Sequence, residues 1–241
     1  GAVAFKLAWG LLKHLAGSER VHPDHRRFLE EALAYVAIAT VCDVVPVLDE
    51  NRVLAHLGLK SLAHTPQVGL QALLRQTDLF GRTITAEEVA FQIGPRINAA
   101  GRLGSAQKAV ELLLTEDAVE AQRLAAELEE LNRRRKSVEA EVEAAARTEA
   151  ERYADPEKHP VLVLAGQGWH QGVVGIVAAR LTESFKRPAI VIGLDGASGR
   201  GSARTVPGFN VLDAMHGAAE HFERYGGHAE AAGCEIAATA V

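Results

Sequence analysis

A long segment without glycine or proline constrains the fold of this chain more than any other feature. Residues 117–153 consist mainly of Glu, Ala, Arg and Leu, which are strong helix formers. At 1.5 Å per residue, one helix over this segment would be roughly 50 Å long. Such a helix is predicted to join two lobes or to pack on one side, and an intermolecular coiled coil is the alternative interpretation. The apolar residues that form its single narrow stripe are Leu124, Leu128, Leu131, Val138 and Val142.

The segments on the two sides of this helix have different patterns. Before it, apolar spacing and a Thr85–Glu88 capping box predict only helices, at 28–42, 51–63, 68–75, 85–93 and 106–114. We expect Gly94-Pro95 to stop the fourth of these helices. After residue 155, strands are expected at 161–165, 189–192 and 197–205, and helices at 173–185 and 210–222. This order indicates an α/β fold with two lobes.

The charge of the chain is unevenly distributed. The 241 residues include 26 Lys and Arg and 31 Asp and Glu, a net charge of −5, which does not favour a general nucleic-acid coat protein. Residues 117–157 hold twelve acidic and seven basic residues and therefore carry the whole excess. Residues 158–205 hold six basic and two acidic residues, and a locally basic cleft can attract phosphate. Ordinary surface charge is the alternative interpretation.

Several classes of protein are excluded by composition. Two cysteines, Cys42 and Cys234, cannot form a disulfide framework or a four-cysteine zinc site, so reduced thiols and a cytoplasmic location are expected. The longest nearly apolar stretch, 32–48, is too short to cross a membrane. The chain starts with Gly1 and an uncapped apolar helical pattern, which leads us to expect a fragment of a longer protein.

Asp43 is a candidate metal ligand. It is the one charged residue between Ala32 and Leu48, and a buried carboxylate needs a basic partner or a cation. It is expected at a helix end just before Pro46, where a loop can direct it into a site. Its oxygen atoms would suit Mg²⁺ or Mn²⁺. A capping or salt-bridged aspartate is the alternative.

Two glycine-containing segments carry groups that can bind phosphate. In residues 94–103, small residues allow close approach of a ligand, and Arg96, Asn98 and Arg102 supply donors for phosphate oxygens. Residues 168–175 lie between an expected strand and helix, where backbone amides and the helix N-terminus can hold an anion. Trp169 in this loop offers a ring that can stack on a base. The alternatives are a glycine-rich connector with solvated arginines and a packed tryptophan.

Two further motifs lie in the C-terminal part of the chain. Residues 226–228, Gly226, Gly227 and His228, are expected to form a glycine turn that carries an imidazole, with a structural turn histidine as the alternative. Four alternating polar residues are expected to share one face of a strand. They are Ser198, Arg200, Ser202 and Arg204.

The ordered set of motifs resembles the RecJ family of single-strand-specific 5′→3′ DNA exonucleases, within the DHH phosphoesterase superfamily. The matching segments are CDVVP at 42–46, GPRINAAGRL at 94–103, GWHQGVVG at 168–175 and GGH at 226–228. The resemblance covers essentially the whole chain. It implies a bilobal α/β fold with the C-terminal part of a DHH domain at 1–116, a connecting helix at 117–153 and a DHHA1 domain at 154–241.

The resemblance also implies roles for individual residues. Asp43 would be a ligand of a catalytic site with two Mn²⁺ or Mg²⁺ ions, and His228 would take part in catalysis. The residues expected to contact single-stranded DNA are Arg96, Asn98, Arg102, Trp169, Ser198, Arg200, Ser202, Arg204, Gly226, Gly227 and His228. DNA repair and recombination would be the process, with a single-stranded-DNA-binding protein and a helicase as partners and no membrane.

One departure from the family pattern limits this expectation. The Asp-His-His motif, which supplies metal ligands in the family, does not occur in the 241 residues. We therefore expect the middle part of such an enzyme, with little activity on its own. The alternatives are a related DHH-DHHA1 hydrolase of oligoribonucleotides or cyclic dinucleotides, and a catalytically inactive nucleic-acid-binding scaffold.

Overall fold

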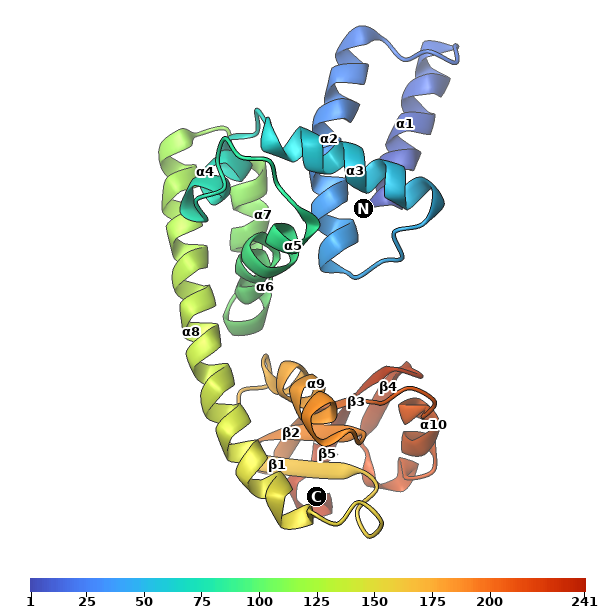
Figure 1. Cartoon of the computed structure of the whole chain (residues 1–241), viewed down its shortest axis with the longest axis vertical. Helices are drawn as coiled ribbons and strands as arrows, with labels where there is room; N and C mark the ends of the chain where they lie inside the picture. The colour runs from blue at the N-terminus through green and yellow to red at the C-terminus, as the bar shows by residue number, and fades with distance from the viewer. The chain divides into compact units, whose positions relative to one another are not determined.

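The computed structural model describes all residues, 1–241, and consists of two compact units (Figure 1). The first unit is Gly1–Asn132 and the second is Arg133–Val241. The boundary falls inside one long helix, α8 (Ala118–Ala150), so this helix contributes residues to both units. The predicted long helix and the predicted α/β fold are confirmed.

The first unit is helical. Its core is a cluster of fully buried leucines and small residues to which α8 contributes Leu124 and Leu128. Its elements are α1 (Ala2–Ala16), α2 (Pro23–Cys42), α3 (Asp49–Ala63), α4 (Val68–Gln76), α5 (Ala86–Glu88), the π-helix η1 (Val89–Ile93), α6 (Gly94–Leu103), α7 (Gln107–Leu114) and the first part of α8.

The prediction that Gly94-Pro95 stops a helix is wrong. The chain continues from η1 directly into α6, and Gly94 donates its N–H to the carbonyl of Val89, five residues earlier. Proline is tolerated in the first turn of a helix, where its missing N–H is not needed. The wide π-turn ends just before Pro95 and thereby places this residue in the first turn of α6.

The second unit is built on a five-stranded sheet in the order β1-β2-β3-β5-β4. Strands β1 (Leu162–Gln167) and β2 (Ala189–Asp195) are parallel and are joined through α9 (Val174–Phe185). The other pairs are antiparallel. The remaining elements are β3 (Ser198–Arg204), α10 (Val211–His216), β4 (Arg224–His228), β5 (Ala231–Ala237) and the 3₁₀-helices η2 (Glu151–Tyr153), η3 (Ala219–His221) and η4 (Ala238–Ala240).

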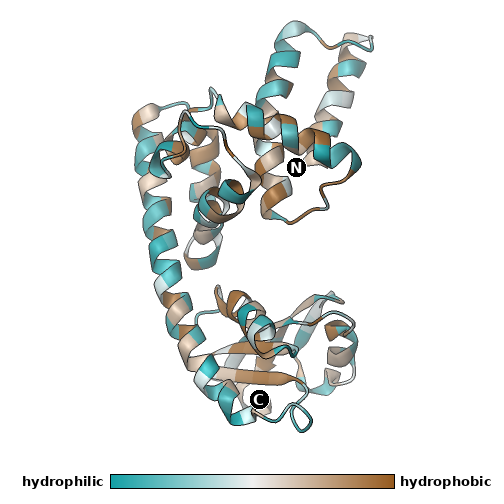
Figure 2. Cartoon of the chain, in the orientation of Figure 1, coloured by the Kyte–Doolittle hydropathy of each residue, from teal (hydrophilic) through white to brown (hydrophobic).

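Each face of the sheet has its own apolar core. Leu162, Leu164 and Val191 pack with α9 and with the end of α8, whereas Ile190 and Ile192 belong to a second cluster with α10. Figure 2 shows hydrophobic colours on β1 and β2 and hydrophilic colours along the middle of α8. The alternation of β2 side chains between two cores explains why this strand is an almost continuous apolar run.

Two predictions for the C-terminal region are wrong. The expected helix 210–222 is only the six-residue α10 followed by η3, and the expected glycine turn at 226–228 is part of strand β4. Neither β4 nor β5 is rich in β-branched residues, so the pairing of β5 with β3 and of β4 with β5 decides their conformation. Gly227 has a φ of 155°, and a Cβ there would lie 2.3 Å from the carbonyl oxygen of Ala231.

None of the helices combines the length and the hydrophobicity that crossing a membrane would require.

Candidate functional site

Asp43 is held at the C-terminal cap of α2. The N–H of Val45 donates to the carbonyl of Thr40 at 3.1 Å, and the N–H of Val44 donates to the carbonyl of Val41 at 3.2 Å. This pair of bonds is a Schellman motif, which ends a helix and turns the chain sharply. Asp43 is the C-cap residue of α2, as the capping alternative has it, and no ion pair supports the salt-bridged alternative. Its side chain is exposed, so the expectation of a buried carboxylate is wrong.

The residue after Asp43 has a strained backbone. Val44 occupies the left-handed position of the Schellman motif with φ 52°, where glycine is the usual residue. A β-branched residue in this region costs roughly 1–2 kcal/mol. The strained turn fixes the direction in which the chain leaves Asp43.

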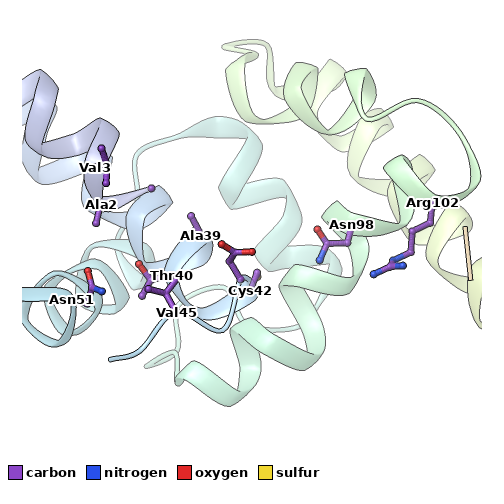
Figure 3. Close-up of a pocket in the computed structure, with 11 residues that line it drawn as sticks. Ala2, Val3, Ala39, Thr40, Cys42, Val45, Asn51, Asn98 and Arg102 are labelled. Carbon is purple, nitrogen blue, oxygen red and sulfur yellow. The ribbon is translucent and has the colours of Figure 1, made fainter. Parts of the chain in front are cut away.

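Close packing brings the start of helix α6 to the C-terminal end of α2, next to Asp43. A Cβ on Gly94 would lie 2.5 Å from the Sγ of Cys42, so the absence of a side chain lets α6 start against the end of α2. Burial raises the pKa of the Cys42 thiol, which suits a packing residue. Asn98 and Arg102 are one turn apart on α6 and project from the same side of it (Figure 3).

Asp43, Asn98 and Arg102 line one cavity of about 670 Å³, which we call the Asp43 pocket. Thr40 and Asn51 add a hydroxyl and an amide to it. The remaining lining residues are Gly1, Ala2, Val3, Ala39, Cys42 and Val45. The structure therefore brings together three of the predicted site residues from segments more than fifty positions apart.

Arg96 lies outside the Asp43 pocket. Its Nε donates to Glu129 of α8 at 2.5 Å, and its Nη1 donates to the carbonyl of Gln92 at 2.6 Å. Both side chains of the ion pair are mostly buried. In this arrangement Arg96 connects α6 to α8, and its contact with nucleic acid stays a prediction.

In the second unit, the predicted alternation along β3 is present. Gly199 and Ala203 face the α10 side, and Ser198, Arg200, Ser202 and Arg204 face the α9 side. A Cβ on Gly175, in the first turn of α9, would lie 3.0 Å from the Ser202 hydroxyl and 3.2 Å from Arg204 Nη2. The polar side chains of β3 therefore lie beside the N-terminus of α9, whose free backbone N–H groups favour an anion.

The register of the antiparallel strands arranges this face in rows. Ser202 lies opposite Gly233, which lies opposite Gly226, and Arg204 lies opposite Ala231, which lies opposite His228. We call these two rows together the Ser202 platform. A Cβ on Gly226 would meet no atom within 4 Å, so the space above the glycine is open. Arg204 Nη1 donates to the Ser202 hydroxyl at 2.8 Å. The platform thus offers a bonded hydroxyl and guanidinium at one end and an imidazole beside the open Gly226 at the other.

Trp169 is a packing residue in this structure. Its ring covers Gly166, where a Cβ would lie 2.2 Å from the ring, and it borders the core between α9 and the sheet. The following His170 accepts a hydrogen bond from Gly172 N–H at 3.0 Å and so shapes the loop before α9. The loop interpretation of 168–173 holds, whereas base stacking by Trp169 stays a prediction.

The chain resembles known proteins along almost its whole length. A model of the DHHA1 domain matches residues 158–241. The chain is 40% identical over 238 residues to the single-stranded-DNA-specific exonuclease RecJ of Bacillus subtilis and 41% identical over 231 residues to that of Thermus thermophilus. These alignments cover 98% and 96% of this chain but only 28% and 32% of the relatives.

Solved structures show the same relation. The crystal structure of RecJ from Thermus thermophilus in complex with Mg²⁺ matches 97% of this chain with a TM-score of 0.83 and 40% identity, over 35% of that structure's chain. A RecJ structure bound to manganese matches with a TM-score of 0.78 and 39% identity, over 55% of its chain. The chain is therefore similar, over almost its whole length, to a part of the RecJ exonucleases.

The RecJ structures with Mg²⁺ and Mn²⁺ raise the question of whether this chain can hold such an ion. The Asp43 pocket supplies one carboxylate, with neutral oxygens on Thr40, Asn51 and Asn98. No group of three His, Cys, Asp or Glu residues gathers anywhere in the structure. The oxygen donors suit a hard cation, and the set is sufficient for part of a coordination sphere but not for all of it.

Sequence reasoning missed four residues that only the fold brings to the Asp43 pocket or to the Ser202 platform. Thr40 and Asn51 reach the Asp43 pocket from helices α2 and α3. Arg224 and Glu235 lie next to the platform through the pairing of β4 with β5. The one sequence signal for strand β4 was the alternation of side chains in RYGGH at 224–228. The two glycines have no side chains, so this alternation was not recognised.

Proposed function

We propose that this chain is part of a metal-dependent 5′→3′ single-stranded DNA exonuclease that hydrolyses phosphodiester bonds in DNA repair and recombination in the cytoplasm. The observation that carries the proposal is the convergence of Asp43, Asn98 and Arg102 on one pocket. The 40% identity to RecJ proteins supports the substrate class. We assign residues 1–116 to the C-terminal part of a DHH domain, 117–153 to the connecting helix and 154–241 to the DHHA1 domain.

In this proposal Asp43 holds one of two Mn²⁺ or Mg²⁺ ions, and further ligands come from outside residues 1–241. A bound ion would activate a water molecule and stabilise the leaving oxygen. Asn98 and Arg102 donate to the phosphate oxygens beside Asp43, and Arg96 extends this contact. These donors orient the phosphodiester relative to the carboxylate, which is the contribution of this chain to the pocket.

The Ser202 platform binds phosphates of single-stranded DNA in the second unit. Ser202, Arg204 and the amides at the start of α9 form one anion seat, with Gly226 and Gly227 allowing the backbone of the ligand to approach. His228 donates to a phosphate oxygen and serves as an electrostatic partner or general acid. Ser198 and Arg200 continue the contact along β3, and Trp169 stacks on a base at the loop.

The test of the metal role is Asp43→Asn in the native full-length protein. Release of nucleotides from 5′-labelled single-stranded DNA is measured with Mn²⁺ and with Mg²⁺. We expect a loss of at least a hundredfold in turnover, because the amide cannot replace a carboxylate ligand. Asp24→Asn, an exposed acid at the other end of α2, is the matched control and should keep full activity. Normal turnover of Asp43→Asn would refute the assignment.

Competition identifies the substrate class. Long single-stranded DNA should displace a labelled strand better than a dinucleotide or a cyclic dinucleotide, because the pocket and the platform each hold phosphates. Preference for the dinucleotides would favour a related DHH-DHHA1 hydrolase instead. Binding without hydrolysis by the native protein would favour an inactive scaffold. A single-stranded-DNA-binding protein and a helicase are the partners we propose.

A further inference from the structure

A row of three charged side chains crosses the sheet beside the Ser202 platform. Arg200 on β3 lies opposite Glu235 on β5, and Glu235 lies opposite Arg224 on the edge strand β4. Arg200 Nη2 is 2.8 Å from Glu235 Oε1, and Arg224 Nη1 is 4.0 Å from Glu235 Oε2. The side chains of Arg200 and Arg224 are 63% and 82% exposed, so both guanidinium groups are accessible to a ligand. We call these three residues the Glu235 row.

The Glu235 row has a fixed place relative to the platform. Arg200 precedes Ser202 by two positions on β3, and Arg204 follows it by two, so all three side chains share one face. The same spacing holds on β4 for Arg224, Gly226 and His228. Successive rows on one face are about 7 Å apart. The row of Ser202, Gly233 and Gly226, which is open at Gly226, therefore lies between two rows that carry positive charge.

The three rows lie side by side across the strands, and we call the middle row the floor and the two outer rows the walls. The floor is made of a serine and two glycines, and one wall holds Arg204 and His228. The opposite wall holds Arg200 and Arg224. A single nucleic-acid strand that lies along the floor presents phosphates to both walls, and a positively charged surface of this kind follows a backbone without reading its sequence.

We propose that the Glu235 row is a second phosphate-binding subsite for single-stranded DNA, with Arg224 as a binding residue and Glu235 as a residue that limits the affinity. The inference rests on the proposed function and deepens it. Glu235 holds Arg200 by an ion pair and repels an incoming phosphate, so the two arginines bind the strand less tightly than they would without the carboxylate. Partial neutralisation of this wall keeps release of the strand fast while retaining the contact.

Anisotropy of a fluorescein-labelled oligothymidine, measured without divalent metal on the full chain over a range of salt concentrations, tests the subsite. Arg224→Ala should raise Kd roughly three- to tenfold and reduce the slope of log K against log salt by about 0.7, because one phosphate contact is lost. Arg224→Lys should restore the slope. Arg152→Ala is the matched control, since Arg152 is an exposed arginine that pairs with Glu149 at 2.7 Å away from the sheet.

Glu235→Gln tests the second half of the inference. It should lower Kd at low salt by a few-fold, and Glu149→Gln, which changes the net charge equally, should leave Kd unchanged. An Arg224→Ala protein that binds like Arg152→Ala, or a Glu235→Gln protein that binds like Glu149→Gln, would overturn the inference. Arg204→Ala distinguishes failure of this inference from failure of the proposed function. If Arg204→Ala also leaves binding unchanged, the Ser202 platform does not bind DNA and the proposed function fails as well.

Discussion

Single residues in this chain have unusual backbone conformations where the candidate site requires them. Val44 follows the exposed Asp43 in a left-handed conformation that disfavours β-branched residues. Such strain is tolerated only where surrounding bonds determine the conformation, and here the two Schellman hydrogen bonds do so. The turn after Asp43 therefore carries a cost in stability that a glycine would remove.

Val44→Gly should stabilise the first unit by about 0.5–1 kcal/mol, because relief of strain exceeds the entropy cost of glycine. The free energy of unfolding in urea, followed by hydrogen exchange of α2, measures the change. Val47→Gly is the control, since Val47 is also exposed and has no left-handed backbone, and it should destabilise the protein by about 0.5–1 kcal/mol. Equal destabilisation by both variants would show that Val44 is not strained.

Gly227→Ala should destabilise the second unit by about 1–3 kcal/mol. A Cβ there would lie 2.3 Å from the carbonyl oxygen of Ala231 and 2.5 Å from the Cα of Ala232, and both atoms belong to the backbone of β5. Gly226→Ala is the adjacent control with open space above it, so its effect should stay within about 1 kcal/mol. Thermal unfolding of the two variants distinguishes them, and similar losses would contradict the packing described for β4.

At the scale of elements, a cluster of charges fixes the end of α8 to α9. Glu139 is almost completely buried and pairs with Arg135 on its own helix and with Arg180 on α9. Arg180 also pairs with Glu143 at 2.5 Å, and Arg147 reaches both Glu143 and Ser184. This cluster holds α9 against α8. Because the first turn of α9 lies beside Ser202, the cluster also helps to position the Ser202 platform.

Glu139→Ala should destabilise the second unit by about 3 kcal/mol, because it leaves the mostly buried guanidinium of Arg135 without its carboxylate. Denaturation of the full chain, followed by exchange of the α9 amides, measures this loss. The control is Glu149→Ala, whose pair with Arg152 is exposed and should contribute less than about 1 kcal/mol. If Glu139→Ala loses no more stability than Glu149→Ala, the cluster does not fix α9.

The same cluster predicts a dependence of stability on pH. Burial raises the pKa of Glu143, but the hydrogen bonds and charges of Arg180 and Arg147 lower it more, so the pKa lies below its ordinary value of 4.5. A lowered pKa stabilises the folded state above pH 4.5, and this contribution is lost as the pH falls through the folded pKa. Urea unfolding between pH 6 and pH 3 should show this loss, and Glu143→Gln should make it smaller. An identical pH profile for Glu143→Gln would contradict the shift.

Most of the helices and the first three strands were predictable because their signals are local, whereas α6 was missed and α10 is shorter than predicted. Residues 118–150 contain only residues that favour helix or tolerate it, and β1 and β2 are rich in Val, Leu and Ile. Strands β4 and β5 were missed because RYGGH and AAGCEIA become strands only through pairing, of β5 with β3 and of β4 with β5. Asp43, Asn98 and Arg102 were found from motifs, whereas Thr40 and Asn51 reach the Asp43 pocket only through the packing of helices. Arg224 and Glu235 depend on a register that no local pattern reveals.

At the scale of the whole molecule, the chain has separate cores on the two sides of residue 132. Leu124 and Leu128 of α8 belong to the core of the first unit, and Val142, Ala146 and Ala150 of the same helix belong to a core of the second. No buried residue is shared between these clusters. Each unit can therefore lose its core without removing buried area from the other, which favours two unfolding transitions.

Leu128→Ala should destabilise the first unit and Leu181→Ala the second, each by about 2–5 kcal/mol, because both leucines are fully buried. Hydrogen exchange across a urea titration reports the two units separately. Each variant serves as the control for the other. Equal loss of protection in both units for either variant would mean that the chain unfolds as one cooperative body.

The register of β3 limits how this protein can change over evolutionary time. Its polar residues and its glycines alternate, so the polar residues face the platform while the glycines fit against Ile192 and Ile236. Deleting one residue between Ser198 and Arg204 would move the side chains on one side of the deletion to the opposite face of the sheet. An arginine would then point toward the apolar core. Single substitutions on the platform face leave the register unchanged and can accumulate one at a time. An insertion or deletion of one residue in this strand needs a second change that restores the register.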